Sequence, residues 1–368
     1  MNDTRVLKAL LAGVEREDHL GGQIYISQNG KVIMNNSFGF CDQERNVPFG
    51  KENLMLWRSA GKPLTAVAVA SLVSSNILSF EDILPVFFPE LEGTDWSGIK
   101  VSHLLTHTAG LLNADKLSES LSWDDMIERI IRSPVDPDWV PGEKAGYHIA
   151  GTWYLLAELC NRLTKTSSYS DWIRRELLIP LGLTNTYIGI PKSKWSDCFS
   201  KKVSPLYITS TKSPTQHPYL DGEPSCTGCR PGGNTRGTAE DLGHFYEWTL
   251  GLHEPLSHLQ PYISDMTQPK RRLGMFDLTF KHKMDWGMGF MVNSNRYGLE
   301  TVPYGFGRYA SGQAYGHGGA QCSSGFADPK HGLVVAWIVN GMPGEIRHQR
   351  RVREINEAAY IDLGITGE

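Results

Sequence analysis

The feature that most constrains the fold is that strand-type segments lie near both ends of the chain, with a helix-rich stretch between them. Near the start, GGQIYISQNGKVIMNNSFGF predicts a β-hairpin, because Ile24 and Ile26 fall on one face of a strand and Asn29 and Gly30 form a two-residue turn. From about residue 284 onward there are three candidate strand segments: WGMGFMVN, SGQAYGHGGAQCSSGFADP and GLVVAWIVNG. The pattern is therefore one of terminal α and β segments that enclose a central helical block.

Helical signals account for both ends of the chain and for most of the middle. The apolar residues of the first expected helix recur at helical spacing: Val6, Leu7, Leu10, Leu11 and Val14. Ser122 is the expected N-cap of another helix. Further helices are predicted over residues 151–164, 168–178, 238–251 and roughly 345–362. The stretch 199–237 is rich in Pro, Ser, Thr and Gly, which indicates a long loop region.

Charge and hydropathy exclude two classes of partner. The 36 Lys and Arg residues against 40 Asp and Glu leave a net charge of -4. The arginines of 347–353 are interspersed with glutamates, which predicts a solvated helix face rather than a nucleic-acid-binding surface. No apolar run approaches the about 20 residues that span a bilayer, so we expect no membrane partner. The N-terminus has neither an uninterrupted apolar stretch nor a small-residue cleavage site, and it keeps its Met, so we expect a cytoplasmic protein.

Neither cysteine nor histidine spacing predicts a metal site. Cys226 and Cys229 form a C-x-x-C pair, but no second ligand pair lies at a suitable spacing, so ordinary loop thiols are expected. His103 and His107 are four residues apart, but the glutamate of the H-E-x-x-H pattern is absent. We therefore expect no metal and no cofactor.

The segment with the clearest chemical potential is Ser59-Ala60-Gly61-Lys62, at the start of an apolar helix. Positions three apart share one helix face, so the Ser59 hydroxyl and the Lys62 amine can meet. A serine needs a base to become a nucleophile, and a lysine in an apolar setting can serve because burial lowers its pKa. The backbone N–H groups of the helix start favour developing negative charge. The alternative interpretation is an N-cap serine followed by a surface lysine.

The order of several segments along the chain favours the catalytic interpretation. The tetrad lies in LWRSAGKPLTAVAVASLV, and it is followed in order by VSHLLTHTAGLLN, WVPGEKAGYHIAGTWYLLAELC, RELLIPLGLTNTYIG, GGNTRGTAEDLGHFYEWTLG and YGHGGAQCSSGFADPKHGLVVAWIVNG. Taken together, these segments resemble the signatures of the serine β-lactamase and penicillin-binding-protein superfamily, especially class C β-lactamases and family VIII carboxylesterases. The resemblance runs from about residue 20 to 342.

This resemblance implies a set of active-site residues. Ser59 and Lys62 match the nucleophile and its lysine, and Tyr147 matches the tyrosine of the Y-x-N element, which exchanges protons with nucleophile and leaving group. His317, Gly318 and Gly319 match the K-T-G element on the strand beside the site, and the N–H groups of Ser59 and Ala320 would form the oxyanion hole. Without the resemblance, Tyr147 would be taken as a half-buried aromatic residue, and the His-Gly-Gly run as a permissive strand edge or turn.

Two departures from the family pattern bear on the substrate. Ile149 stands where the Y-x-N element has its asparagine, so the side-chain amide that contacts β-lactams is missing. His317 replaces the K-T-G lysine and is largely neutral at pH 7, which makes it a poor anchor for a carboxylate. His148 is a further residue that could line the pocket. The expected substrate is therefore a small-molecule ester or acyl donor without charge.

The resemblance implies an α/β (α+β) fold with two lobes. Residues 1–76 and 280–368 should form an antiparallel sheet flanked by helices, residues 77–279 should form a mostly helical lobe, and the site should lie in the cleft between them. Three functions fit such a site: a carboxylesterase, an acyltransferase that passes the acyl group to an alcohol or amine, and a non-catalytic sensor or binding domain. The intact Ser59, Lys62 and Tyr147 set favours an enzyme over a sensor. No motif indicates an oligomeric state.

Overall fold

The main sheet combines the two ends of the chain. The computed structural model describes residues 4–111 and 121–367. Within these ranges the main sheet has seven strands, and each neighbouring pair runs antiparallel. In spatial order they are β10 (Asp285–Trp286), β11 (Met291–Val292), β12 (Tyr315–Gly319), β13 (Ser323–Asp328), β14 (Leu333–Val339), β1 (Gly21–Gln28) and β2 (Lys31–Gly39).

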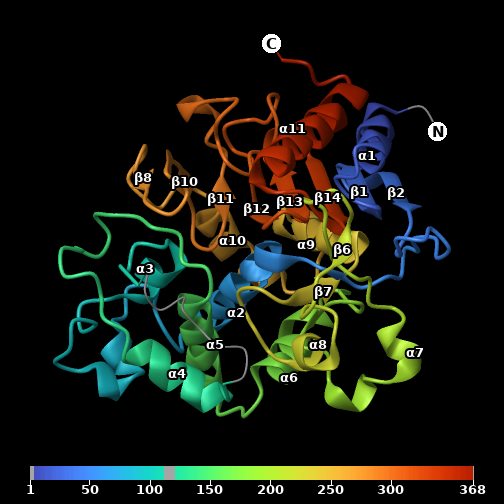
Figure 1. Ribbon diagram of the computed structural model, residues 1–368. Coiled ribbons are helices and arrows are strands. Elements are labelled where there is room, and N and C mark those ends of the chain that lie inside the picture. Colours follow the sequence, from blue (N-terminus) through green and yellow to red (C-terminus); the bar gives the residue numbers. More distant parts are fainter. Residues whose placement is uncertain (1–3, 112–120, 368) are drawn as a thin grey trace.

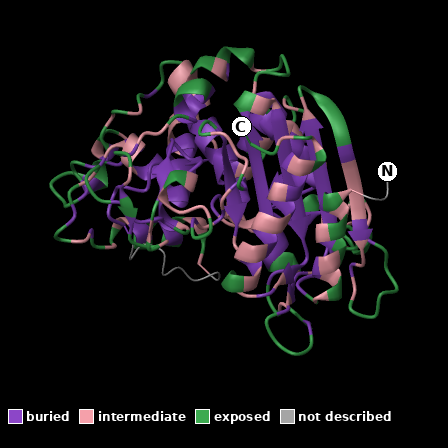
Figure 2. Cartoon of the chain, turned by 90° about the horizontal axis from the view of Figure 1, so that it is seen from above, coloured by how far each residue is buried: buried purple, intermediate pink, exposed green. Residues whose placement is uncertain are grey.

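Helices cover both faces of this sheet. The helices of the described ranges, including those of the helical block away from the sheet, are α1 (Arg5–Glu15), α2 (Lys62–Ser74), α3 (Val101–Leu105), α4 (Trp123–Ile131), α5 (Gly151–Thr164), α6 (Tyr169–Ile173), α7 (Asp197–Ser200), α8 (Glu223–Thr227), α9 (Ala239–Thr249), α10 (Gln260–Met266) and α11 (Glu345–Asp362). The first and last helices, α1 and α11, lie side by side over one face, and α9 packs against β1, β13 and β14 on the other (Figure 1). The central strands between these layers are buried, whereas the edge strand β2 and the outer sides of the helices are largely exposed or intermediate (Figure 2).

Local sequence explains the hairpin and the central strand. Asn29 and Gly30 both have positive φ, as the two-residue turn between β1 and β2 requires, so the predicted hairpin is confirmed. Ile24 and Ile26 face the core that β1 shares with α1 and α11. All seven residues of β14 are buried, which explains its nearly continuous apolar sequence.

Short strands pair outside the main sheet. They form three small sheets in the described ranges: β3 (Met55–Leu56), β7 (Thr235–Gly237) and β4 (Tyr187–Ile188); β15 (Gly341–Met342), β5 (Tyr207–Ile208) and β6 (Thr215–Gln216); β8 (Phe276–Asp277) and β9 (His282–Lys283). The predicted loop region 199–237 therefore carries several short elements. One of them, β7, pairs with the strand that leads into Ser59.

Several expected elements are confirmed, and others need correction. The helices at 151–164 and 345–362 have the predicted bounds, and Ser122 caps α4 through its side chain. The helix predicted at 168–178 divides into α6 and a π-helical turn over Arg174–Leu178. The first of the three candidate strands is two strands, β10 and β11, which are joined through Gly287 and Gly289, and the second is the hairpin of β12 and β13, which turns at Ala320 and Gln321. Leu11 of the expected apolar stripe is 42% exposed.

The arginines near the C-terminus do not form a solvated face, as was expected. Arg351 is fully buried, and Arg347 and Arg350 bind the carboxylate of buried Asp18, because α11 packs against the loop that joins α1 to β1. The division into lobes at residues 76 and 280 stays a prediction, and α9 of the central block contributes to the layer beside the sheet. Leu112 and Asn113 of the quoted segment 101–113 lie outside the described residues. No helix in the described ranges is both long enough and apolar enough to cross a membrane.

Candidate active site

Ser59 lies on a short 3₁₀ turn, η1 (Arg58–Gly61), that leads directly into α2. The first hydrogen bond of this turn runs from Ala60 N to Trp57 O, so the Ser59 N–H precedes the bonded part of the turn. Arg58, immediately before Ser59, has a φ of 53°, a strained value for a residue with a side chain. Backbone strain of this kind persists where the surrounding structure holds it, and it is common at functional sites.

Lys62 is the first residue of α2 and is completely buried. Its Nζ lies 3.0 Å from Ser59 Oγ, 2.8 Å from the carbonyl oxygen of Ile149 and 2.5 Å from that of Gly232. The alternative of a surface lysine is therefore wrong. The predicted contact between serine and lysine is present, and it is supported by carbonyls from two distant loops.

Tyr147 lies beside this lysine, in the loop that precedes α5. Its side chain is buried, with 7% exposure, and Lys62 Nζ lies 5.2 Å from the centre of its ring. Its ring packs against those of His107, Phe280 and Trp286, at centre-to-centre distances of 4.7, 4.8 and 5.7 Å. The structure thus brings Ser59, Lys62 and Tyr147 into one corner, and Tyr147 is more deeply buried than a half-buried aromatic residue.

Strand β12 places the His-Gly-Gly run next to the serine turn. A side chain at Gly319 would lie 2.1 Å from Trp57 O, so only glycine permits this approach. Gly318 is similarly tight, because a Cβ there would lie 2.5 Å from the Tyr304 ring. Ala320 follows at the end of β12, in the turn to β13. The expected oxyanion-hole residues, Ser59 and Ala320, therefore belong to neighbouring segments.

His317 is buried and neutral. Burial, helped by the nearby Lys62 charge, lowers the pKa of His317 to about 3. Its Nδ1 lies 2.7 Å from the carbonyl oxygen of Gly318, which can only accept, so Nδ1 carries the proton and Nε2 keeps a lone pair. The ring centre is 6.0 Å from that of Tyr147. A lysine at this position would supply a positive charge, whereas His317 supplies none at neutral pH.

Ile149 and His148, which follow Tyr147, differ in exposure. The Ile149 side chain is 57% exposed although its carbonyl holds Lys62, so an apolar group projects outward at the site. His148 is fully buried, its backbone N–H donates to His107 Nδ1, and its Nε2 accepts from the Leu111 N–H at 3.4 Å. That His148 lines the pocket stays a prediction, beside the alternative of a position behind the site; its ring packs against that of His107, with the ring centres 5.3 Å apart.

Three residues that hold the site were not identified from the sequence. Gly232 supplies a carbonyl to Lys62, Asp277 binds the Tyr147 N–H at 3.0 Å, and Arg271 pairs with Asp277. Gly232 lies at the edge of a segment already noted for its family resemblance, but nothing in a glycine indicates a carbonyl contact. Asp277 and Arg271 carry no local signal, since their partners are distant in sequence.

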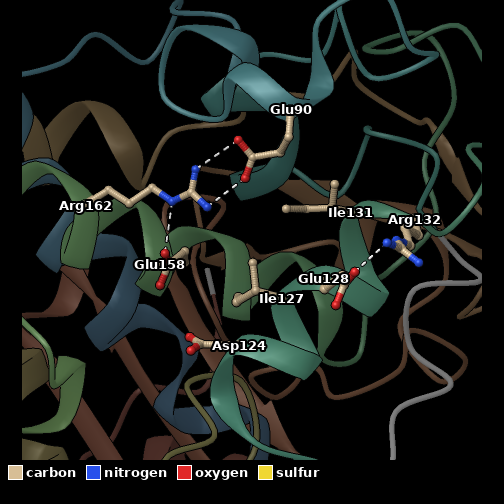
Figure 3. Close-up of a pocket in the computed structure, with 8 residues that line it drawn as sticks. All are labelled: Glu90, Asp124, Ile127, Glu128, Ile131, Arg132, Glu158 and Arg162. Carbon is tan, nitrogen blue, oxygen red and sulfur yellow. Dashed lines mark hydrogen bonds and ion pairs between the residues drawn. The ribbon is translucent and has the colours of Figure 1, made fainter.

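The described residues contain no group of three His, Cys, Asp or Glu side chains arranged to hold a metal ion. His103 and His107 use their Nδ1 atoms for the N–H groups of Lys100 and His148. A hollow of about 440 Å³ lies elsewhere, and it is lined by Glu90, Asp124, Ile127, Glu128, Ile131, Arg132, Glu158 and Arg162 (Figure 3). There Arg162 pairs with Glu90 and Glu158. The hollow is therefore lined by ion pairs of the helical block, and it does not include the residues of the serine site.

Comparison with known proteins defines the class in two steps. Two solved structures share the fold over nearly the whole chain. A penicillin-binding-protein homologue from Caulobacter crescentus matches with a TM-score of 0.78 and 26% identity, covering 97% of this chain and 96% of that one. A family VIII carboxylesterase matches with a TM-score of 0.78, 21% identity and the same coverage. The fold is therefore the β-lactamase and transpeptidase fold, as predicted.

The family follows from the sequence match. A family model described as Beta-lactamase matches residues 6–360, and the chain belongs to this family of β-lactamase-like serine hydrolases. Penicillin-binding protein 4* of Bacillus subtilis (strain 168) is 24% identical over 196 residues, which cover 51% of this chain and 42% of that protein. The matched stretch spans about half the length of the first curated relatives.

Proposed function

We propose that this protein is a serine esterase that hydrolyses an uncharged carboxylic ester through an acyl-enzyme on Ser59. The observation that carries the proposal is the arrangement around Lys62 Nζ, 3.0 Å from Ser59 Oγ, with carbonyl oxygens of Ile149 and Gly232 on other sides. A neutral amine has two N–H groups and one lone pair. When the two carbonyls accept the N–H groups, the lone pair is left for the Ser59 hydroxyl proton.

The reaction then proceeds in two balanced halves. Ser59 Oγ attacks the ester carbonyl carbon while its proton passes to Lys62, and the N–H groups of Ser59 and Ala320 stabilise the oxyanion. The bond to the alcohol oxygen breaks, and the alcohol leaves with a proton that Lys62 delivers through the Tyr147 hydroxyl. Water repeats the sequence on the acyl-enzyme, which releases the carboxylic acid and restores Ser59.

Two side chains support the proposal that the substrate has an uncharged, apolar acyl group. Ile149 presents an exposed apolar surface where an amide would contact a β-lactam, and buried His317 is neutral because its pKa is lowered to about 3. Loss of a charge-assisted contact typically costs about 1.5–3 kcal/mol. We therefore propose that esters are far better substrates than penicillins or cephalosporins.

The test uses a fluorophosphonate probe and p-nitrophenyl esters. One adduct on the peptide that contains Ser59 and steady release of p-nitrophenol are expected, and both should be lost in Ser59→Ala. Ser71→Ala is the matched control, because Ser71 lies on the adjoining α2 with its hydroxyl bonded to Ala68 O. Undiminished labelling of Ser59→Ala would refute the nucleophile.

The same assay separates the other two functions. Added alcohols that divert the acyl group into new esters would identify an acyltransferase. Labelling of Ser59 without turnover would identify a sensor or binding domain. A cytoplasmic location stays a prediction.

A further inference from the structure

The backbone of Tyr147, and not only its ring, is fixed by a segment far away in the sequence. The Tyr147 N–H donates to Asp277 Oδ1 at 3.0 Å, and the Tyr147 carbonyl accepts from Thr279 Oγ1 at 2.9 Å. Asp277 Oδ1 also accepts from the N–H groups of Thr279 and Phe280, each at 3.0 Å. Both backbone polar groups of Tyr147 are thus bonded to one compact turn that follows β8.

Arg271 completes this turn from behind. Its guanidinium donates to Asp277 Oδ2 at 2.9 Å, and both side chains of the pair are fully buried. Its Nε donates to the Thr106 carbonyl at 2.5 Å, and its Cζ lies 4.9 Å from the Trp286 ring that packs on Tyr147. Burial lowers the pKa of Arg271 to about 10, opposed by Asp277, so the arginine stays charged at neutral pH.

The two segments that Arg271 joins are the two that enclose the tyrosine loop. On one side, Thr106 precedes His107, whose φ of 56° is strained. His107 accepts from His148 N through Nδ1 and from Gly146 N through its carbonyl. On the other side, Asp277 accepts from Tyr147. Arg271 therefore fixes the distance between Thr106 and Asp277, and residues 146–148 lie between the segments that contain them.

Stability alone gives an incomplete account of this pair. A buried ion pair costs desolvation energy on both partners, and well-packed apolar side chains of similar volume are often as stabilising or more so. What apolar residues cannot supply is direction, since a guanidinium has fixed N–H vectors that can hold Thr106 and Asp277 at once. A geometry of this kind is useful where a small displacement has a large consequence.

We propose that the buried Arg271–Asp277 ion pair is the positioning device of Tyr147, which holds the phenol in register with Ser59 and Lys62. The inference rests on the proposed function, in which Tyr147 passes a proton to the leaving alcohol. A misplacement of about 1 Å can reduce a rate by about 10²-fold. Arg271 and Asp277 are positioning residues, because they act on Tyr147 from behind.

The first test is Asp277→Asn, which keeps size and shape but removes the charge that faces Arg271. With p-nitrophenyl ester as substrate, kcat should fall by about 10–100-fold while KM changes by less than about threefold. Arg271→Lys provides a second route should Asp277→Asn not fold. A lysine keeps the charge, but a single ammonium on a flexible stem lacks the planar fork that holds both Thr106 and Asp277, so the same fall in kcat is expected.

The deciding measurement is a double-mutant cycle with Tyr147→Phe. When Tyr147 has lost its hydroxyl, its register no longer matters, so Asp277→Asn should lower kcat by less than about threefold in that background. Asp18→Asn is the matched control: it also removes a buried carboxylate from arginine partners, Arg347 and Arg350 among them, yet Asp18 lies at the α1–α11 junction. Asp18→Asn should leave kcat unchanged relative to each background, wild type or Tyr147→Phe.

The outcomes are distinct. Equal losses from Asp277→Asn in the presence and absence of the Tyr147 hydroxyl would overturn the positioning role and leave the proposed function intact. A loss from Asp18→Asn as large as that from Asp277→Asn would also overturn it, since the effect would then follow from destabilisation alone. Near-wild-type turnover of Tyr147→Phe would remove the tyrosine from the reaction, and the positioning role with it, while the Ser59 labelling would still report on the esterase.

Discussion

Two of the places where the chain buries charged side chains, the junction at Asp18 and the serine site at Lys62, surround those charges in different ways. At the junction of α1, α11 and β1, Asp18 is completely buried. Its carboxylate accepts from the guanidinium groups of Arg16, Arg347 and Arg350 at 3.0, 2.7 and 3.2 Å. Opposite full charges meet here, and they join the first helix to the last.

At the serine site, the described hydrogen bonds of Lys62 go to a hydroxyl and two backbone carbonyls. The imidazoles around it are neutral, because burial lowers the pKa of His148 and His317 to about 3 and that of His107 well below its ordinary value. Neutral acceptors solvate the amine whether or not it carries its proton. In the proposed function, Lys62 takes up and releases a proton among these neutral groups, whereas the charges at Asp18 join the first helix to the last.

The largest expected effect comes from removal of the lysine. Lys62→Met should lower kcat/KM on an activated ester by about 10²–10⁴-fold, because the base that takes the Ser59 proton is lost. The melting temperature should equal or exceed that of the wild type, since a buried ammonium is replaced by an apolar chain. Ester turnover and thermal unfolding of the same preparation measure both. A strongly lowered melting temperature would place Lys62 with Asp18 among the structural charges.

At Asp18 we expect a loss of stability without a loss of activity. Asp18→Asn should reduce the free energy of unfolding by about 3 kcal/mol, because three guanidinium groups lose the carboxylate that they share. Activity per folded molecule should not change. Urea unfolding measures the free energy of unfolding. The control is Glu128→Gln, which breaks an exposed ion pair with Arg132 and should change that free energy by less than about 1 kcal/mol. Loss of activity without loss of stability would contradict the structural role.

Acid should destabilise the serine corner through its histidines. The pKa of His317 is about 3 in the folded protein against an ordinary 6.5, so between these values the unfolded chain binds the proton first. Stability is therefore lost as the pH falls through 6.5 toward 3, by roughly 2 kcal/mol per buried histidine between pH 6.5 and 5. His317→Gln should lose that much less than the wild type when unfolding is measured at pH 7 and pH 5. His258→Gln, at an exposed position, should behave like the wild type.

The smallest expected effect concerns selectivity. Ile149→Asn should raise the ratio of cephalosporin to p-nitrophenyl ester turnover by about fivefold, since one added hydrogen bond is worth about 1 kcal/mol. Ile179→Asn is the matched control, because Ile179 is also exposed and lies at the end of the π-helical turn, away from Ser59. An unchanged ratio in Ile149→Asn would show that this side chain does not face the substrate.

A feature could be predicted from the sequence when the residues that determine it lie close together along the chain. The hairpin at Asn29 and Gly30 and the helix of residues 345–362 were predictable because turn chemistry and helical periodicity act over a few residues. The strands β12 and β13 were missed as separate elements because their turn has little local signature, and Gln321 there adopts a positive φ of 57° without being glycine. The arginines of α11 were taken for a solvated face, since their partner Asp18 lies more than 300 residues away.

For the site itself, the sequence determined the pair that is one helical turn apart. Ser59 and Lys62 meet because α-helical and 3₁₀ geometry place positions three apart on one face, whatever the rest of the chain does. Only the tertiary structure decided how Lys62 is solvated, how far burial lowers the pKa of His317, and which residues hold Tyr147. Gly232 and Asp277 reach their partners across 170 and 130 residues, and a pKa shift by burial depends on how completely packing excludes water. Such quantities belong to the folded chain, because they arise from contacts between segments whose local sequences carry no record of one another.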